Sequence, residues 1–186
     1  MLDTAQLSPE QCRPITRAEY LRMGEAGLFE NERVELIEGV VVRVTPHGAP
    51  HDDTVERLTE LLVPRLVGRA RVRIQLSFAA SEYSEPLPDV AIIPKGAPRG
   101  DHPSAALLLI EVSDSSLRFD RGVKAKVYAR AGVPEYWVVN VPRRTVEVYS
   151  APTERGYAHQ REARGGEQLS IPEFPDVALP IAAIFD

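Results

Sequence analysis

The chain has 186 residues, of which 44% are hydrophobic and 26% are charged, and its formal net charge is −5. These values are typical of one globular domain with a complete hydrophobic core. The acidic balance argues against a broad basic surface that grips nucleic acid by charge alone, so any such contact is expected to be local or assisted by a metal ion.

The cysteine content and the distribution of apolar residues favour a cytoplasmic protein. Cys12 is the single cysteine, so no disulfide can form within the chain, which fits a reducing compartment. No basic and then apolar leader opens the chain, and no apolar run approaches the roughly 18 residues that a membrane-spanning helix needs. We therefore expect a cytoplasmic protein without membrane contact, with a flexible N-terminal arm at residues 1–15 and a single domain at residues 16–186.

The first predicted elements are a helix and a hairpin. Thr16 and Glu19 have the spacing of a capping box, in which each side chain accepts a hydrogen bond from the other residue's backbone, so a helix is expected to begin there. In the segment 33–44 apolar residues alternate or run together around Glu38 and Gly39. This pattern predicts two strands joined by a tight turn.

The next elements are a long helix and three strands. Apolar residues recur every three or four positions from 51 to 66, which predicts an amphipathic helix that Pro64 kinks or shortens. Strict alternation at 69–78 predicts a half-buried strand. Two apolar runs at 90–93 and 107–112 are separated by a segment rich in proline and glycine, so they are expected to pair as antiparallel neighbours.

The last part of the chain predicts a helix and another hairpin. Apolar residues at steps of four predict a helix over 119–130. The apolar runs 136–139 and 145–149 are expected to pair across a short turn. After a glycine-rich, charged stretch, Ile181 and Ile184 are expected to dock as a final turn.

Two acidic residues lie at the ends of neighbouring predicted strands. Asp89, preceded by Pro88, opens one strand and Glu111 closes the next. In an antiparallel pair the start of one strand lies beside the end of the other, so these acids are expected to meet at one edge of the sheet. Two carboxylates there could hold Mg²⁺ or Mn²⁺, because hard divalent ions take oxygen ligands, and the Val112 carbonyl could add a third oxygen.

Metal-assisted hydrolysis of a phosphodiester also needs a positive group near the attacking water or the phosphate. In the commonest layout of such sites a lysine lies two residues after the glutamate, but Ser113 occupies that position here. Lys124 is the best substitute because it borders the apolar stripe of its helix, where Tyr128 shares its face. Lys126 lies on the opposite flank of the stripe and is the second choice.

The strings PDVAII, LLLIEVSDSS and DRGVKAKVYARAGVPEYWVVN, with VELIEG near the front, resemble the Uma-two family of restriction-endonuclease-like proteins within the PD-(D/E)XK nuclease superfamily. The resemblance covers roughly residues 16–150. It implies an α/β fold with a restriction-endonuclease-like core, a central mixed β-sheet flanked by helices; additional β-hairpins come from the patterns above. By position, it implies that Asp89 and Glu111 are catalytic metal ligands and that Lys124 is a catalytic lysine that has moved from the strand to the following helix. Glu35 resembles an acid that many superfamily members bring to the same site, so it is a further candidate ligand.

Each of these residues also has a structural interpretation. Asp89 could stabilise a turn, since aspartate is a frequent turn-former. Lys124 could pair with Asp120 four residues earlier, and Glu35 could be an exposed strand residue. Glu111 is harder to explain structurally, because a buried carboxylate without a partner costs several kcal/mol.

Two histidines invite a zinc interpretation. His47 and His51 are followed by two aspartates, but Gly48 and Pro50 between them break the helical spacing that would direct both rings at one ion. No cysteine joins them, so we expect His51 to lie at the start of its helix without a metal.

Two functional classes follow. The first is a metal-dependent endonuclease that cleaves DNA as a homodimer, which the two acids and the helix lysine favour. The second is a catalytically inactive nuclease fold that serves as a nucleic-acid or protein interaction module. The acidic charge and Ser113 favour this alternative. Asn140 is a second departure from the family pattern, since it stands where the family often shows aspartate after its tryptophan strand.

Overall fold

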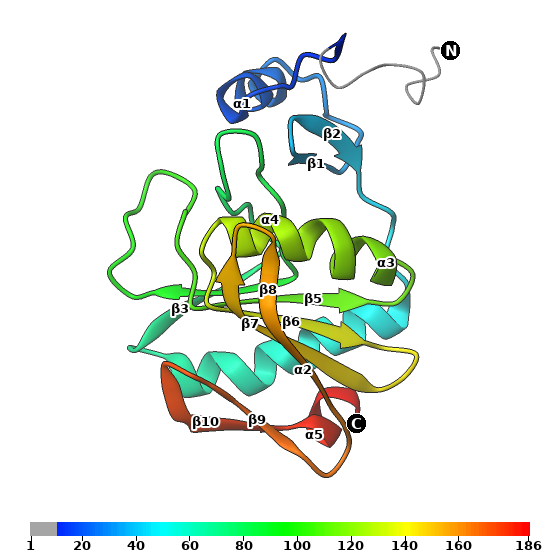
Figure 1. The fold of residues 1–186 in the computed structure, drawn as a ribbon, viewed down its shortest axis with the longest axis vertical. Coiled ribbons are helices and arrows are strands. Elements are labelled where there is room, and N and C mark those ends of the chain that lie inside the picture. Colours follow the sequence, from blue (N-terminus) through cyan, green and yellow to red (C-terminus); the bar gives the residue numbers. More distant parts are fainter. Residues whose placement is uncertain (1–10) are drawn as a thin grey trace.

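The computed structural model describes residues 11–186, which fold around a six-stranded sheet (Figure 1). The strand order is β3-β4-β5-β6-β7-β8. β5 and β6 are parallel, and the other neighbours are antiparallel. The fold is therefore α/β with a central mixed sheet, as predicted. The strands are β3 (Ala70–Ile74), β4 (Val90–Pro94), β5 (Leu108–Ser113), β6 (Glu135–Asn140), β7 (Thr145–Thr153) and β8 (Gly156–Ala163).

A helical crossover joins the two parallel strands, because a tight turn cannot connect them. It comprises α3 (Leu117–Phe119), a π-helical turn η3 (Asp120–Lys124) and α4 (Ala125–Arg130). The predicted helix over 119–130 is confirmed and begins at Leu117. Single π-helical turns within α-helices are frequent at functional sites, and this one ends at Lys124.

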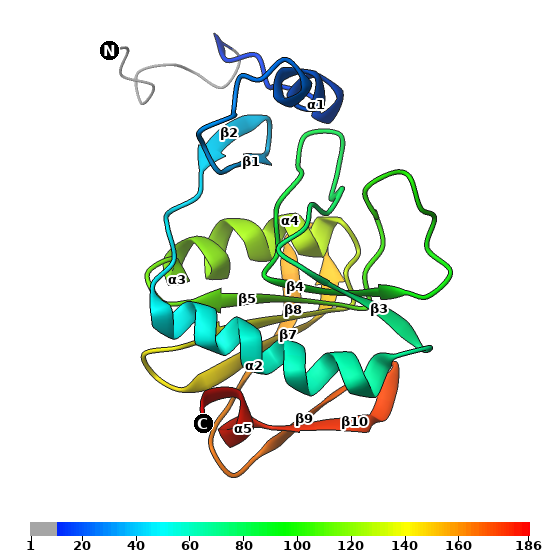
Figure 2. The same cartoon turned by 180° about the vertical axis from the view of Figure 1, so that it is seen from behind.

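The opposite face of the sheet is covered by α2 (Ala49–Leu66), as the view from behind shows (Figure 2). Its buried apolar side chains include Leu58 and Leu62. The helix runs through Pro64, so of the two effects expected of this residue, a kink or a shortening, the shortening does not occur. Proline removes one backbone donor, and so close to the end of a long helix the remaining hydrogen bonds hold the last residues in place.

An N-terminal layer lies on the α4 side of the sheet (Figure 1). It contains α1 (Arg17–Glu25) and a hairpin of β1 (Val34–Ile37) and β2 (Val40–Arg43). The predicted capping box of α1 and the predicted turn of the hairpin are both confirmed. The turn residues have φ of 49° at Glu38 and 79° at Gly39, as tight hairpin turns require. All four residues of β1 are buried, so both faces of this strand are covered by the rest of the molecule.

The C-terminal segment packs beyond α2, on the far side from α4 (Figure 2). It forms the hairpin of β9 (Gln168–Ile171) and β10 (Phe174–Pro180), followed by α5 (Ile181–Phe185). Ile181 and Ile184 are both buried in a final turn, as predicted. The sequence did not predict β8, β9 or β10.

Two remaining predictions concern the extent of the strand expected at 69–78 and of the N-terminal arm expected at 1–15. The strand expected over 69–78 ends at Ile74, because Gln75 has φ of 51° and leaves the extended conformation. Residues 1–10 of the expected arm at 1–15 lie outside the described part of the chain. Within residues 11–186, no helix has the length and apolar character needed to cross a membrane.

Each strand of the sheet sends alternate residues to opposite faces. Ile110 and Val112 of β5 pack in the aliphatic cluster under α2, whereas Leu109 packs in the cluster under α4. Glu111 therefore faces the α4 side. The same alternation puts Asp89, two residues before Ala91, on that side at the neighbouring strand end.

Candidate active site

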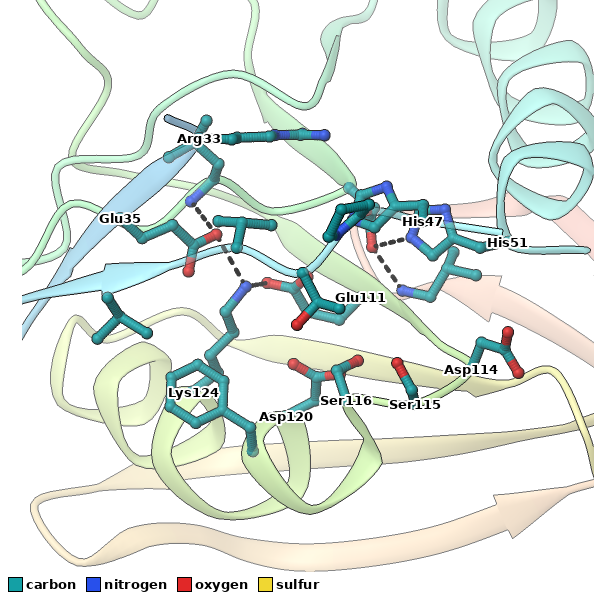
Figure 3. Close-up of a pocket in the computed structure, with 18 of the residues that line it drawn as sticks. Arg33, Glu35, His47, His51, Glu111, Asp114, Ser115, Ser116, Asp120 and Lys124 are labelled. Carbon is teal, nitrogen blue, oxygen red and sulfur yellow. Dashed lines mark hydrogen bonds and ion pairs between the residues drawn. The ribbon is translucent and has the colours of Figure 1, made fainter. Parts of the chain in front are cut away.

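Four acidic side chains and one lysine gather at the end of the sheet beneath the N-terminal hairpin, and Figure 3 labels all of them except Asp89. They come from different elements, and all five residues are at most 6% exposed. The group lines a cavity of about 260 Å³. Its members are Glu35 of β1, Asp89 before β4, Glu111 of β5, and Asp120 and Lys124 of η3.

Lys124 joins two of these acids. Its Nζ donates hydrogen bonds to Glu111 Oε1 at 2.9 Å and to Glu35 Oε1 at 3.1 Å. Tyr128, one turn further on, donates its hydroxyl to the same Glu111 oxygen at 2.6 Å. Lys126 is exposed, so the prediction that Lys124 is the nearer lysine is confirmed. The alternative of an exposed Glu35 is wrong, because packing of the hairpin on the core buries it.

Among the described residues Lys124 forms ion pairs with Glu35 and Glu111 and not with Asp120, although the charge of Asp120 also favours the protonated amine. Asp120 Oδ2 accepts hydrogen bonds from Ser116 and, at 2.7 Å, from Ser113. Ser113 therefore uses the usual lysine position to hold an acid of the following helix. Neither contact was predicted. Ser113 and Ser116, which precede the helix, are the signal that could have suggested hydrogen bonds from serine hydroxyls to an acid of its first turn.

Asp89 ties β4 to β5 and to α2. Its Oδ2 accepts from the Val112 backbone N–H at 2.8 Å and lies 3.2 Å from His51 Nε2. Its Oδ1 accepts from Gln75 Nε2 at 3.2 Å. The carboxylate is thus held by long-range contacts on both oxygens rather than by a local turn.

The surroundings shift the pKa values of the three central groups. Burial favours protonation of Asp89, but the hydrogen bond and charge of His51 and the Val112 N–H outweigh it and lower its pKa. Burial raises the pKa of Glu111 well above its usual range; Lys124 opposes this, whereas Asp89, Asp120 and Glu35 reinforce it. Burial disfavours the charged form of Lys124, but the surrounding acids outweigh it, so its pKa is raised and the amine stays protonated.

His47 and His51 lie side by side, contrary to expectation. Their ring centroids are 3.7 Å apart, and one ligand atom from each ring and one from Asp89 all lie within 4.8 Å of one another. His51 is in the first turn of α2, as predicted, but His47 precedes the helix. Gly48 is the extended N-cap of that helix, so the entering loop rather than helical spacing returns His47 to its partner.

Asn140 lies at the end of β6, directly opposite Ser113 of β5. It is buried, and its Oδ1 accepts from the Arg143 backbone N–H at 3.2 Å. Its Nδ2 is buried without a hydrogen-bond partner among the described residues. Asn140 thus holds the β6–β7 turn.

The mixed sheet, the crossover helix and the acid–lysine cluster at the strand ends define a restriction-endonuclease-like α/β protein. Residues 17–182 match the model of the Uma2 family, described as "Putative restriction endonuclease". Because the match spans most of the sequence, the chain belongs to this family.

The comparison with solved structures agrees on the fold. A putative nuclease belonging to DUF820 from Anabaena variabilis ATCC 29413 is similar with a TM-score of 0.71 and 18% sequence identity. The alignment covers 92% of this chain and 98% of that chain. At this identity the likeness is evidence for the fold alone. No curated protein matches the sequence significantly.

Proposed function

We propose that the protein is a metal-dependent endonuclease that hydrolyses DNA phosphodiester bonds with Mg²⁺ or Mn²⁺. The observation that carries the proposal is the buried Lys124 amine between Glu111 and Glu35, in a cavity that Asp89 also lines. Membership of the Uma2 family supports the same reaction class.

The charge of the site fits a divalent cation. Four buried carboxylates, those of Glu35, Asp89, Glu111 and Asp120, line the cavity together with Lys124, and His51 adds a positive charge when it is protonated. Burial is the main cause of the raised pKa of Glu111, and the neighbouring acids add to it. A bound cation would relieve the repulsion, because nearby positive charge favours the ionised form of a carboxylate.

The donor atoms also fit. Glu111 Oε1 accepts from Lys124 and Tyr128, whereas its Oε2 accepts no hydrogen bond from the residues that the structure describes. Because the Val112 N–H donates to Asp89, and the N–H and C=O of a residue in an extended strand point to the same side, the Val112 carbonyl turns toward Asp89. Asp89, Glu111 and Val112 would thus supply oxygen ligands of the kind that Mg²⁺ prefers.

The chain's own side chains have separable roles. A bound divalent ion supplies Lewis-acid activation of the phosphate and of an attacking water. Lys124, which stays protonated, donates to a phosphate oxygen or to the water and stabilises negative charge as it develops. Glu35 positions the amine and is a further candidate ligand, and Tyr128 orients Glu111.

Arginines at the mouth of the cavity provide the local contact with DNA. Arg33 and Arg43 are exposed and line the cavity. With the chain at −5 overall, few phosphates can be neutralised, so DNA affinity should be modest and should fall as salt rises. Because enzymes that cut both strands commonly place two sites by two-fold symmetry, we also propose a two-fold homodimer, whose mass by light scattering would be twice 20.6 kDa.

The test compares cleavage of DNA by wild type, Glu111→Gln and Lys124→Met at fixed Mg²⁺ or Mn²⁺. Each substitution should lower the rate by about 100-fold or more, as expected for loss of a group that stabilises the transition state, and chelation should abolish wild-type cleavage. Lys126→Met is the matched control, since this lysine is exposed on the same helix, and it should retain wild-type activity.

Two outcomes would contradict the proposal. A folded wild type that binds Mn²⁺ but cuts neither DNA nor RNA would favour the interaction module, which Ser113 in the usual lysine position also favours. Equal cleavage by wild type and all variants would identify a contaminating nuclease.

A further inference from the structure

We propose that His47, His51 and Asp89 form a nitrogen–oxygen site for a divalent transition-metal ion, with Mn²⁺ as the physiological candidate. The inference rests on the proposed function, because Asp89 is shared with the oxygen ligands of the nuclease centre. It goes beyond that function by adding two imidazole ligands and a preference for Mn²⁺ over Mg²⁺.

The distances suit ligands of one ion. Two ligand atoms that each lie about 2.1 Å from an ion are about 3.0 Å apart at a right angle and about 3.4 Å apart at the tetrahedral angle. His51 Nε2 and Asp89 Oδ2 are 3.2 Å apart, between these values. One atom of His47 lies within 4.8 Å of both, so a small ring rotation would complete the set.

The His51 ring is already oriented as metal-binding histidines are. Its Nδ1 lies 3.2 Å from Asp52 Oδ1, which directs Nε2 toward Asp89. In metal sites the second ring nitrogen almost always donates to a carboxylate, a carbonyl or water, and this contact fixes the tautomer. Asp52 thus has the role of a positioning residue in this arrangement.

A hydrogen bond between His51 and Asp89 would account for those two residues but not for His47. The His47 side chain is 20% exposed, with Nδ1 3.5 Å from Gln75 Nε2 and 3.9 Å from Asp52 Oδ1. Neither contact is a close hydrogen bond. His47 lines the central cavity and also an open groove beside α2, so an ion can reach its ring from solvent.

The ligand chemistry selects the ion. Imidazole nitrogen suits first-row transition metals, and affinity for mixed nitrogen and oxygen sites rises from Mn²⁺ toward later members of the series. Mg²⁺ instead prefers oxygen ligands and retains waters. Mn²⁺ binds most weakly of this series, and it is the candidate because it is the transition-metal ion that also suits the carboxylates of the nuclease centre.

The experiment measures nitrogen coupling to bound Mn²⁺ by pulsed electron paramagnetic resonance, with Mn²⁺ and Mg²⁺ affinities from calorimetry. Wild type should show imidazole nitrogen coupling, and His51→Gln and His47→Gln should each reduce it and weaken Mn²⁺ binding by about tenfold or more. Mg²⁺ affinity should remain within about twofold of wild type. His47 is partly exposed, so His47→Gln keeps the test valid if His51→Gln fails to fold.

One control variant and one variant of the positioning residue sharpen the result. His159→Gln alters an exposed histidine of β8 and should leave both affinities and the coupling unchanged. Asp52→Asn should weaken Mn²⁺ binding by about tenfold while the nitrogen coupling persists, which a purely structural role of Asp52 would not produce.

The failures are distinguishable. Mn²⁺ and Mg²⁺ binding that depends on Glu111 but shows no nitrogen coupling would overturn the histidine site and leave the proposed nuclease centre standing. No binding of either ion would overturn both.

Discussion

The two faces of the central sheet bury side chains of different chemistry. On the α2 face, Ile110 and Val112 continue an aliphatic cluster that runs to the strand end. On the α4 face, Leu109 is apolar, but the next residue on that side is Glu111, with Asp89 at the end of the adjacent strand. One strand thus supplies apolar packing to one layer and an acid to the other.

This contrast separates stability from function within one sheet. The aliphatic face stabilises the fold in proportion to the apolar area it removes from water. The α4 face also buries an apolar cluster, but the acids at its strand ends oppose folding, because burying charged groups is unfavourable unless they are paired. Functional sites are commonly destabilising in this way, and stabilising substitutions there tend to reduce function. The following predictions test the division, from the largest expected effect to the smallest.

Loss of the central cation should have the largest effect. Lys124→Met should lower the free energy of unfolding by about 3–5 kcal/mol, because it leaves buried carboxylates without their partner. Urea denaturation with chelator present would measure the change. Lys126→Met, at an exposed position, should stay within about 0.5 kcal/mol of wild type. Equal stability of the two variants would mean that Lys124 does not neutralise the acids of the α4 face.

A cavity on the aliphatic face should affect stability alone. Leu58 is fully buried in α2, so Leu58→Ala should cost about 2–5 kcal/mol while Mn²⁺ affinity of the folded protein remains unchanged. Denaturation and calorimetry below the unfolding transition would measure the two quantities. Val63→Ala on the same helix, 37% exposed, is the control and should cost less. A parallel loss of metal affinity in Leu58→Ala would couple the two faces.

Removing one acid should stabilise the protein, whereas removing the lysine should destabilise it. Glu111→Gln should raise the free energy of unfolding by on the order of 1 kcal/mol in chelator, because burial makes ionised Glu111 unfavourable and Glu35 still holds Lys124 at 3.1 Å. The same urea experiment measures it, with exposed Glu173→Gln as the control. A destabilised Glu111→Gln would show that the ion pair with Lys124 outweighs the repulsion.

The smallest effect is expected for Glu19, a partly exposed acid that contrasts with buried Glu111. Hydrogen bonds from the Thr16 backbone, the Arg13 side chain and the Thr16 hydroxyl lower the pKa of Glu19 from 4.5 to about 2. Because the folded-state pKa lies below the unfolded one, its stabilisation is complete above pH 4.5 and is lost as pH falls through about 2.

Titration of the Glu19 carboxyl by nuclear magnetic resonance would measure this pKa. Thr16→Ala should raise it only in part, because alanine keeps the backbone N–H but removes the hydroxyl. An unchanged value in Thr16→Ala would assign the shift to Arg13 and the backbone.

Local patterns in the sequence were sufficient for the elements that bury one regular face. Alternation predicted the hairpin of β1 and β2, and periodicity predicted α2 and the crossover helix. β8 was missed because it is an edge strand whose residues are mostly exposed and polar, so it lacks the alternating apolar signal. The pairing of β4 with β5 was predictable because they are consecutive antiparallel strands.

The sequence by itself therefore determined that two acids lie at neighbouring strand ends, because strand direction alone brings Asp89 beside the end of β5. Only the tertiary structure decided which partners they meet. Glu35 and Lys124 are 89 positions apart, and His51 and Asp89 are 38 apart. The physical reason is that periodicity fixes which face a side chain takes, whereas these contacts depend on how a hairpin, a loop and two helices pack around one end of the sheet.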